Sequence, residues 1–379
     1  MDYLTWRGDL LFSERSFNEV DNVILSELAY FDYGEASGGT VTVARALADH
    51  DGTPAPHGYP MNDPMPLLRA CAASPRFRDV AVSDYESILD KARQIQFSAV
   101  TFTLPTGEIY VAFRGTDNTI VGWREDFNAS FMEQTPAQAE AVAYLDRALA
   151  KHPGTLLVGG HSKGGNLAVY SAAFCKAPER IAAVYSNDGP GFNQYVTESP
   201  EFSAVQSKVR LILPEFSLIG LLLSNVSEKT VVQSTASGAM QHDTYTWVTE
   251  RDHFVRAKQT GASVLLDRTL DRWIDSLDRE QREQFVSVLF DLLEASGADT
   301  VEQLHKSSWS AYQAIFKAAG SLDESTRAGL LESLKKLASS GASTVKQEGK
   351  KLASAGKTAT VEELRQLADM IFHRSEDTV

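Results

Sequence analysis

The chain has 379 residues, of which 43% are hydrophobic and 23% charged. This is the composition of an ordinary globular protein, and the length suits two domains or one large domain with an appendage. The formal net charge of −14 excludes a general electrostatic attraction to nucleic acid or to anionic membranes, so no nucleic-acid partner is expected.

The N-terminal segment and the apolar stretches bear on localisation. Residues 1–13 lack the basic start and unbroken apolar stretch of a secretory signal. The apolar stretch 211–223 is interrupted by polar residues and is too short to span a bilayer. Cys71 and Cys175 show no metal-ligand spacing, so we expect two reduced, packed thiols. A cytoplasmic protein without a transmembrane segment is predicted.

The first elements along the chain are predicted to be helices. Apolar residues recur at helical spacing over residues 22–31 and 83–95, and a loop with proline and glycine lies between them at 51–65. The pattern then changes to period two over residues 97–104 and 109–113, with a short turn between the two runs. This change is typical of a β-hairpin that follows a helical prelude.

The middle of the chain alternates between helical and strand patterns. Such an alternation implies parallel strands joined by helical crossovers, so this part is predicted to be an α/β sheet domain. The predicted elements are a helix over 136–151, a strand over 155–160, a helix over 163–176, and strands over 181–187, 208–213 and 230–234.

Amphipathic helical patterns replace the strands after about residue 270. They cover residues 278–295, 301–319, 324–339 and 360–372. The stretch 340–358, rich in Lys, Ser, Gly and Ala, is predicted to be a weakly held helix or a linker. We expect a sheet domain with a helical N-terminal prelude over 1–269 and an appended α-helical region over 270–379, whose protein partners the sequence does not indicate.

The clearest chemical signal is Gly160-His161-Ser162-Lys163-Gly164, a G-x-S-x-G motif between a predicted strand and a helix. A sharp strand-to-helix turn exposes the serine hydroxyl, and the glycines make room for its strained backbone. The start of the following helix adds free N–H groups where an oxyanion develops. The motif predicts that Ser162 is a nucleophile, and an incidental serine in a glycine-rich turn is the alternative.

A second signal lies at the end of an upstream strand. Phe113-Arg114-Gly115-Thr116 ends the predicted hairpin, and Trp123 and Asp126 follow it. In folds built around a nucleophile elbow, the loop after an upstream strand supplies the other half of the oxyanion hole. Thr116 is suited to this role through its backbone N–H and its hydroxyl.

Together these motifs resemble the fungal-type (class 3) lipases, and especially an uncharacterised bacterial branch of that superfamily. Segments like Asn187-Asp188-Gly189-Pro190-Gly191-Phe192, Ser217-Leu218-Ile219-Gly220 and Gln241-His242-Asp243 also occur in that branch. The resemblance spans roughly residues 29–247 and leaves the C-terminal helices uncovered. It implies an α/β-hydrolase (class 3 lipase-like) sheet domain.

The resemblance also implies roles for individual residues. Carried over by position, Ser162 is the nucleophile, Thr116 and the Lys163 N–H form the oxyanion hole, and Asp126 supports the loop that holds Thr116. Lys163 departs from the lipases, which commonly have an apolar residue at this position. Ser217 departs as well, since it occupies the position at which the fungal lipases carry their acid.

A serine hydroxyl needs a neighbouring imidazole to accept its proton. The fold places its elements in the order serine, acid, histidine, so the base is expected after the last core strands. Histidines that come too early or belong to the helical tail are His50, His57, His152, His305 and His373. His161 is expected to point elsewhere from its strand end. We favour His242, which matches the motif of the bacterial branch, and His253 is the alternative base.

The acid orients the imidazole and stabilises its charged form. Asp188 follows the strand after the nucleophile helix and is the favoured acid, with a turn residue before Gly189-Pro190 as the other interpretation. Glu215, at the end of the next strand, is the alternative acid. Asp243 and Asp252 are sequence neighbours of the candidate histidines and therefore poor partners for them.

These residues predict a serine hydrolase that cleaves carboxylic esters, lipid-like ones among them, through an acyl-enzyme on Ser162. No metal or organic cofactor is expected, and the partner is a small-molecule or lipid-like ester. The alternatives are a noncatalytic α/β-hydrolase scaffold for protein binding, and an acyltransferase or thioesterase with the same triad. The apolar run 218–223 is expected to be a buried core segment, with binding of an acyl chain as the alternative.

Overall fold

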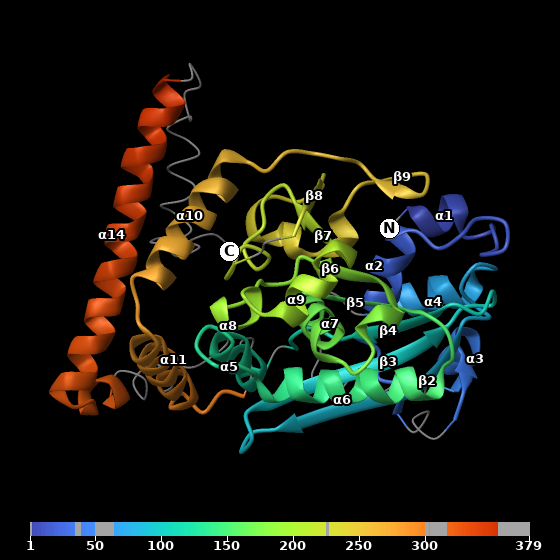
Figure 1. Cartoon of the computed structure of the whole chain (residues 1–379), viewed down its shortest axis with the longest axis horizontal. Coiled ribbons are helices and arrows are strands. Elements are labelled where there is room, and N and C mark those ends of the chain that lie inside the picture. The colour runs from blue at the N-terminus through green and yellow to red at the C-terminus, as the bar shows by residue number, and fades with distance from the viewer. Residues whose placement is uncertain are drawn as a thin grey trace.

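The computed structural model describes residues 2–34, 39–49, 64–117, 119–224, 227–299, 303 and 317–354, with side chains to residue 344. An eight-stranded sheet in the order β1 to β8 forms its centre (Figure 1). Strands β1 to β4 pair antiparallel, and β4 to β8 pair parallel. The predicted α/β class with appended C-terminal helices is confirmed.

The strands lie close to the predicted ranges from residue 97 onward. The sheet consists of β1 Val41–Thr42, β2 Ala81–Asp90, β3 Ile95–Thr103, β4 Ile109–Phe113, β5 Leu156–His161, β6 Ile181–Asn187, β7 Val209–Pro214 and β8 Lys229–Val232. A separate short ribbon pairs β9 Thr249–Glu250 with β10 His253–Phe254. The predicted hairpin is the β3–β4 pair, in which Phe102 lies opposite Tyr110.

The segment 83–95 is not the helix that its pattern predicts, because it lies in β2 and the start of β3. The register of β2 against β3 shifts between Ser83 and Glu86, and Asp84 there has a φ of 56°. Such a β-bulge interrupts the alternation of side chains between the two faces. Val82 and Tyr85 therefore share one core cluster although they are three residues apart, which imitates helical spacing.

Helices cover both faces of the sheet. One face packs against α6 Pro136–Lys151, α7 Lys163–Phe174 and α9 Pro200–Val205, and the other against α2 Glu19–Leu28 and α4 Met65–Ala73. The remaining short helices are α1 Tyr3–Arg7, α3 Val43–Asp49, α5 Ile120–Asn128 and α8 Gln194–Thr197. The helical prelude expected for 22–31 corresponds to α2, while most of the predicted loop 51–65 lies outside the described residues.

Local sequence signals fix where the main helices begin. Thr135 caps α6 by accepting from the Gln138 backbone N–H while the Gln138 side chain accepts from the Thr135 N–H, and Pro136 occupies the first helical position. Asn18 and Asp21 form the same reciprocal cap on α2. The cap at Thr135 explains why α6 begins at the residue where its sequence pattern predicts a helix.

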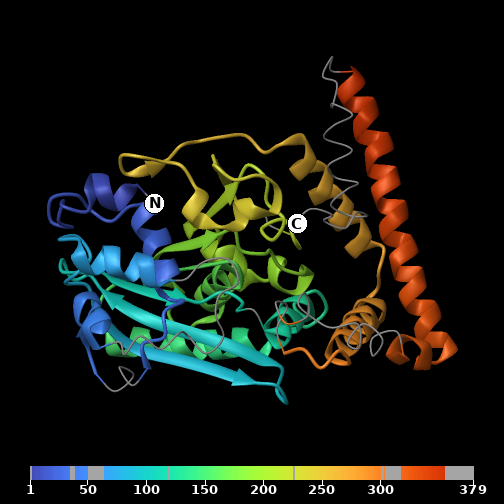
Figure 2. The ribbon, with the colours of Figure 1, turned by 180° about the vertical axis from the view of Figure 1, so that it is seen from behind.

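Three long helices form the described C-terminal part: α10 Gly261–Asp275, α11 Arg279–Glu294 and α14 Glu324–Ser354. The prediction for 278–295 is confirmed, and α14 extends the prediction for 324–339 through most of the stretch expected to be a weak helix or linker. The prediction for 360–372 and most of 301–319 lie outside the described residues. Figure 2 shows α14 alongside α10 at one side of the molecule.

The sequence did not predict α10, and the expected boundary between residues 269 and 270 falls inside that helix. The division into two domains stays a prediction.

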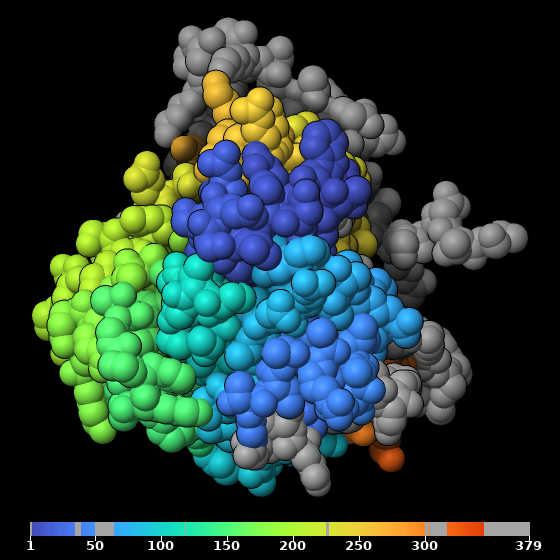
Figure 3. Space-filling model, turned by 90° about the vertical axis from the view of Figure 1, so that its right-hand side faces the viewer, coloured from blue at the N-terminus to red at the C-terminus, as the bar shows by residue number. Residues whose placement is uncertain are grey.

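Cys71 and Cys175 are buried free thiols, as expected. Among the described residues, no helix is long and apolar enough to cross a membrane. Figure 3 shows the N-terminal residues lying across one outer face, between helices α3 and α4 and the gold-coloured segments that come later in the chain.

Candidate active site

The turn between β5 and α7 has the geometry of a nucleophile elbow. Ser162 has φ 58° and ψ −132°, a strained conformation for a residue other than glycine, and it is mostly buried. A Cβ atom on Gly160 would overlap with the backbone of Gly164, and one on Gly164 would overlap with the Phe113 carbonyl. The two glycines of the motif therefore allow strand, elbow and helix to approach this closely.

Main-chain hydrogen bonds align the neighbouring strand ends with this elbow. The Ser162 N–H donates to the Asn187 carbonyl at 2.9 Å, and the Asp188 N–H donates to the Ile212 carbonyl at 2.8 Å. Since β5, β6 and β7 are parallel, their carboxyl ends meet at one edge of the sheet, where ligands bind in such folds. Ser162 and Asp188 thus lie on adjacent strand ends.

Asp188 and His242 form a hydrogen-bonded acid–base pair in which the acid is buried and the base half-buried. His242, at the end of the 3₁₀ turn Gly238–His242, places its Nδ1 2.7 Å from Asp188 Oδ2. The Ser217 hydroxyl donates to the other carboxylate oxygen at 2.5 Å. Asp188 is fully buried, with a φ of 49° that aspartate tolerates. The serine that stands at the lipases' acid position therefore supports an acid that comes from the preceding strand.

The alternative acid and the alternative base are not brought to this pair. One Glu215 carboxylate oxygen accepts from the Ser234 backbone N–H at 3.5 Å, beyond β8. His253 lies exposed on β10 beside Asp252, 3.3 Å from its carboxylate. The described geometry joins Asp188 to His242 and leaves both alternatives outside.

His161 contacts His242 and has hydrogen-bond partners of its own. Its Nε2 lies 2.9 Å from the His242 carbonyl oxygen. Because a carbonyl only accepts, Nε2 carries the proton and Nδ1 accepts from the Tyr30 hydroxyl at 3.2 Å. The two imidazole rings are 4.5 Å apart between centroids. Since His161 directly precedes Ser162, these contacts hold His242 beside the elbow.

Burial keeps His161 and Glu27 uncharged near neutral pH. Burial, with a smaller contribution from His242, lowers the pKa of His161 well below its usual value. Burial likewise raises the pKa of Glu27 to about 8. Glu27 Oε1 lies 3.3 Å from His161 Nδ1 and accepts from the Thr244 hydroxyl at 2.8 Å. His161 and Glu27, next to the Asp188–His242 pair, therefore form a polar but uncharged layer.

The loop after β4 brings Thr116 against the elbow. A Cβ on Gly115 would lie 2.6 Å from the His161 carbonyl oxygen and 3.0 Å from Ser162 Cβ, so only glycine allows this approach. The Thr116 hydroxyl donates to Asp126 Oδ2 on α5. Burial raises the pKa of Asp126 to about 7, against the opposing effects of Lys163 and Thr116. Asp126 thus fixes the loop that carries Thr116.

The Lys163 side chain is buried, and its ammonium group contacts several oxygen atoms of the protein. Its Nζ donates to the Gln96 carbonyl at 2.7 Å and to Gln96 Oε1 at 2.5 Å, and it lies 3.3 Å from Glu125 Oε2. Asp126 Oδ1 is 3.9 Å away. The ammonium group therefore ties the start of α7 to β3 and α5, which accounts for a lysine at a position that is commonly apolar in lipases.

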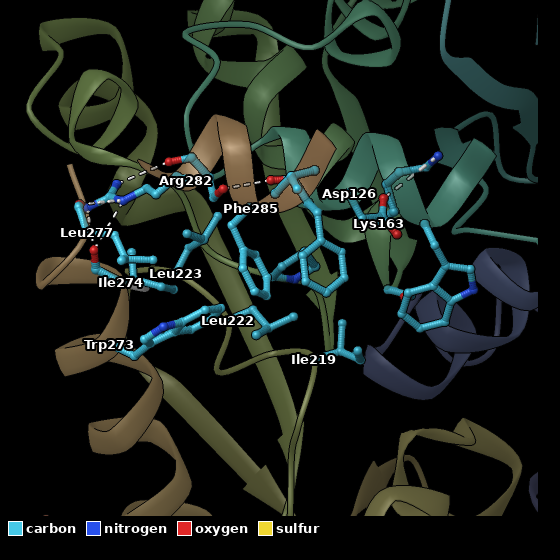
Figure 4. Close-up of a pocket in the computed structure, with 16 residues that line it drawn as sticks. Asp126, Lys163, Ile219, Leu222, Leu223, Trp273, Ile274, Leu277, Arg282 and Phe285 are labelled. Atoms are coloured by element: carbon cyan, nitrogen blue, oxygen red, sulfur yellow. Dashed lines mark hydrogen bonds and ion pairs between the residues drawn. The ribbon is translucent and has the colours of Figure 1, made fainter. Parts of the chain in front are cut away.

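A pocket of about 70 Å³ opens beside these groups (Figure 4). Ser162, Lys163 and Asp126 line it on one side, and apolar residues of α5, the loop after β7, α10 and α11 line the rest. No side chain from α10 or α11 was singled out from the sequence, because their apolar faces look like those of any core-facing helix.

Residues 71–291, more than half of the chain, match the Mbeg1-like family. The chain belongs to the Mbeg1-like family. This is a lipase-like family, so the expected lipase-like α/β-hydrolase fold is confirmed, while the bacterial branch within it stays a prediction. The matched range includes Thr116, Ser162, Asp188 and His242, and it also includes α10 and most of α11.

Other comparisons add little to the Mbeg1-like assignment. No curated protein matches the chain. Among solved structures, the crystal structure of M37 lipase is similar, with a TM-score of 0.33 and 15% identity over 55% of this chain and 71% of that one.

Several residues of the site were missed in the sequence. Glu27 and Tyr30 come from α2 and its end, and Gln96 and Glu125 from β3 and α5. A signal for Glu27 existed, since a carboxylate in the apolar run Val23-Ile24-Leu25 to Leu28 interrupts a face that is otherwise suited to the core. Gln96 and Glu125 carry no such local signal, because their partner is the side chain of Lys163.

Proposed function

We propose that this member of the Mbeg1-like family is a serine hydrolase that cleaves carboxylic esters through an acyl-enzyme on Ser162. The observation that carries the proposal is the Asp188–His242 pair at 2.7 Å, held next to a serine in a strained elbow. Strained backbone at a non-glycine residue costs free energy and persists at functional sites. The lipase-like family agrees with ester hydrolysis.

The chemistry follows from the position of each group. The Ser162 hydroxyl attacks the ester carbonyl carbon while His242 takes its proton through Nε2, since Nδ1 faces Asp188. Asp188 holds this tautomer and stabilises the imidazolium. The oxyanion is held by the backbone N–H groups of Thr116 and Lys163, the second of which begins α7.

The second half of the reaction returns the enzyme to its starting state. The tetrahedral intermediate expels the alcohol, which takes the proton from His242, and the acyl group stays on Ser162. Water then attacks the acyl carbonyl, gives its proton to His242, and releases the carboxylic acid while Ser162 recovers its proton.

The test uses a fluorophosphonate probe and p-nitrophenyl butyrate with the full chain. Wild-type protein is expected to be labelled on Ser162 and to turn the ester over, while Ser162→Ala and His242→Ala each remove most turnover because triad members act as a unit. Matched controls are Ser203→Ala on an exposed position of α9 and His253→Ala. A folded wild-type protein that neither labels nor hydrolyses would instead support a noncatalytic scaffold.

A further inference from the structure

The pocket beside Ser162 has walls from parts of the chain that are far apart in sequence. Trp123 and Phe127 on α5 and Leu222 and Leu223 after β7 belong to the sheet region, whereas Trp273 and Phe285 belong to α10 and α11. Figure 4 shows Lys163 and Asp126 towards one end of the pocket and Arg282 and Leu277 towards the other, with Leu222 and Phe285 between.

We propose, building on the proposed esterase function, that α10 and α11 form the selective wall of the acyl-binding pocket, which takes slender, unbranched acyl groups of short to medium length. The C-terminal helices would then determine which esters Ser162 attacks.

The charges of the pocket favour an uncharged guest. Arg282 donates through Nε and both terminal nitrogens to the carbonyls of Ile274, Leu277 and Ser130 at 2.8 to 3.2 Å. Lys163 is likewise engaged with Gln96 and Glu125. Both cations that line the pocket are thus already paired with oxygen atoms of the protein. A carboxylate or phosphate on the guest is therefore disfavoured.

The wall formed by the C-terminal helices is held firmly enough to discriminate by shape. The Trp273 indole N–H donates to the Ser333 carbonyl of α14 at 3.0 Å, and its ring meets Phe285 edge-on at 5.2 Å. The Arg282 hydrogen bonds to the last turn of α10 and to Ser130 join this wall to the segment after α5.

The opposite wall is also fixed by backbone contacts. The Gly191 N–H donates to the Leu222 carbonyl at 2.8 Å, and Ser224 pairs with Phe192 in both directions. Leu223 has a φ of 65°, a conformation that is rare for leucine and persists where the surroundings hold it in place. The apolar run 218–223 thus supplies side chains that line the pocket, as well as the buried core residue Leu221.

The size of the pocket limits the guest. Its volume of about 70 Å³ is roughly half that of an apolar cavity of ~150 Å³ that binds benzene. A single linear chain fits such a space better than an aromatic or branched acid. Burial of each methylene contributes about 0.8 kcal/mol, which corresponds to about fourfold in kcat/KM per methylene until the pocket is filled.

The experiment measures kcat/KM for p-nitrophenyl acetate, butyrate, hexanoate, octanoate and benzoate. Wild-type protein is expected to prefer an unbranched chain over benzoate. Trp273→Ala should enlarge the pocket and raise the benzoate-to-butyrate ratio at least tenfold. Ile274→Trp, from a half-buried lining position on the same helix, should fill it and lower the hexanoate-to-acetate ratio at least tenfold.

Two further measurements separate the possible failures. Trp6→Ala, a matched loss of an indole that is 70% exposed, should leave every ratio unchanged, and fluorophosphonate labelling of Ser162 reports that each variant has folded with an intact elbow. Normal labelling with unchanged ratios in both pocket variants overturns this inference alone. Absent labelling of wild-type protein overturns the proposed function and the inference with it.

Discussion

The strand ends and the helices α10 and α11 enclose the same pocket but are held by different interactions. Main-chain hydrogen bonds between neighbouring strands fix Ser162 and Asp188. Helix α11 is held by side chains instead, since Phe285 and Phe290 pack against α5 and Arg282 donates to the Ser130 carbonyl. The nucleophile and the acid are thus set by backbone geometry, and the groups that select are set by side-chain contacts. Changes at the strand ends should alter the chemistry, and changes in the helices should alter selectivity or stability.

The largest effect is expected from a substitution of Asp188, at the end of a strand. Asp188→Asn should lower kcat for p-nitrophenyl butyrate by roughly 10⁴-fold, because the amide no longer holds His242 in the tautomer that accepts the Ser162 proton. Steady-state kinetics with active sites counted by fluorophosphonate labelling measures it. Glu215→Gln is the matched control, and a larger loss in that variant than in Asp188→Asn would move the role of acid to Glu215.

The next largest effect is the pH dependence of stability that arises from Glu27, in the uncharged layer next to the Asp188–His242 pair. The pKa of Glu27 is raised to about 8 from a usual value of 4.5, so the folded state binds this proton more tightly than the unfolded state does. The associated stability is complete below pH 4.5 and is lost as the pH rises towards 8, by at most about 5 kcal/mol.

Urea unfolding between pH 4.5 and 8.5 measures this loss in wild-type protein and in Glu27→Gln. The glutamine variant should show a shallower decline, while Asp126, whose pKa is raised to about 7, contributes a decline of the same sign in both proteins. Glu201→Gln, at an exposed position, is the control. Parallel curves for Glu27→Gln and wild-type protein would mean that Glu27 is ionised when the protein is folded.

A smaller effect is expected at His161, a positioning residue that acts through the backbone of His242. His161→Phe should lower kcat about 10²-fold with little change in KM, because a small displacement of His242 spoils proton transfer. His161→Gln should recover most of this loss, since its amide N–H can reach the His242 carbonyl. Equal activity in the two variants would show that this hydrogen bond has no part in placing the base.

The smallest effect is expected from the loss of an ionic contact between α5 and α11. Arg124 on α5 lies 3.0 Å from Asp291 and 3.1 Å from Glu294 on α11, and both carboxylates are about half exposed. Such pairs contribute little, so Arg124→Met should lower the free energy of unfolding by less than about 1 kcal/mol in a urea titration. A loss above about 2 kcal/mol would show that charge, in addition to packing, holds the helices in place.

The same contrast explains what the sequence alone could predict. The hairpin, the parallel strands and the elbow carry local signals, and Asp188 and His242 follow from the order of elements along the chain. The helix predicted for 83–95 was wrong because the bulge at Asp84 is a property of strand pairing. Trp273, Phe285 and Glu125 could not be assigned to the site because their roles depend on partners that only the folded chain brings near.

Helix α2 shows how the chain closes on itself during folding. Its side chains bond Asn187, Thr244 and the Phe254 backbone N–H, which follow it by 165, 217 and 235 residues. Loops of this length close slowly, so these three contacts of α2 form only after most of the sheet has been synthesised. A helix near the start of the chain thus completes its contacts only when Phe254 has left the ribosome, so the final step of folding comes late in synthesis.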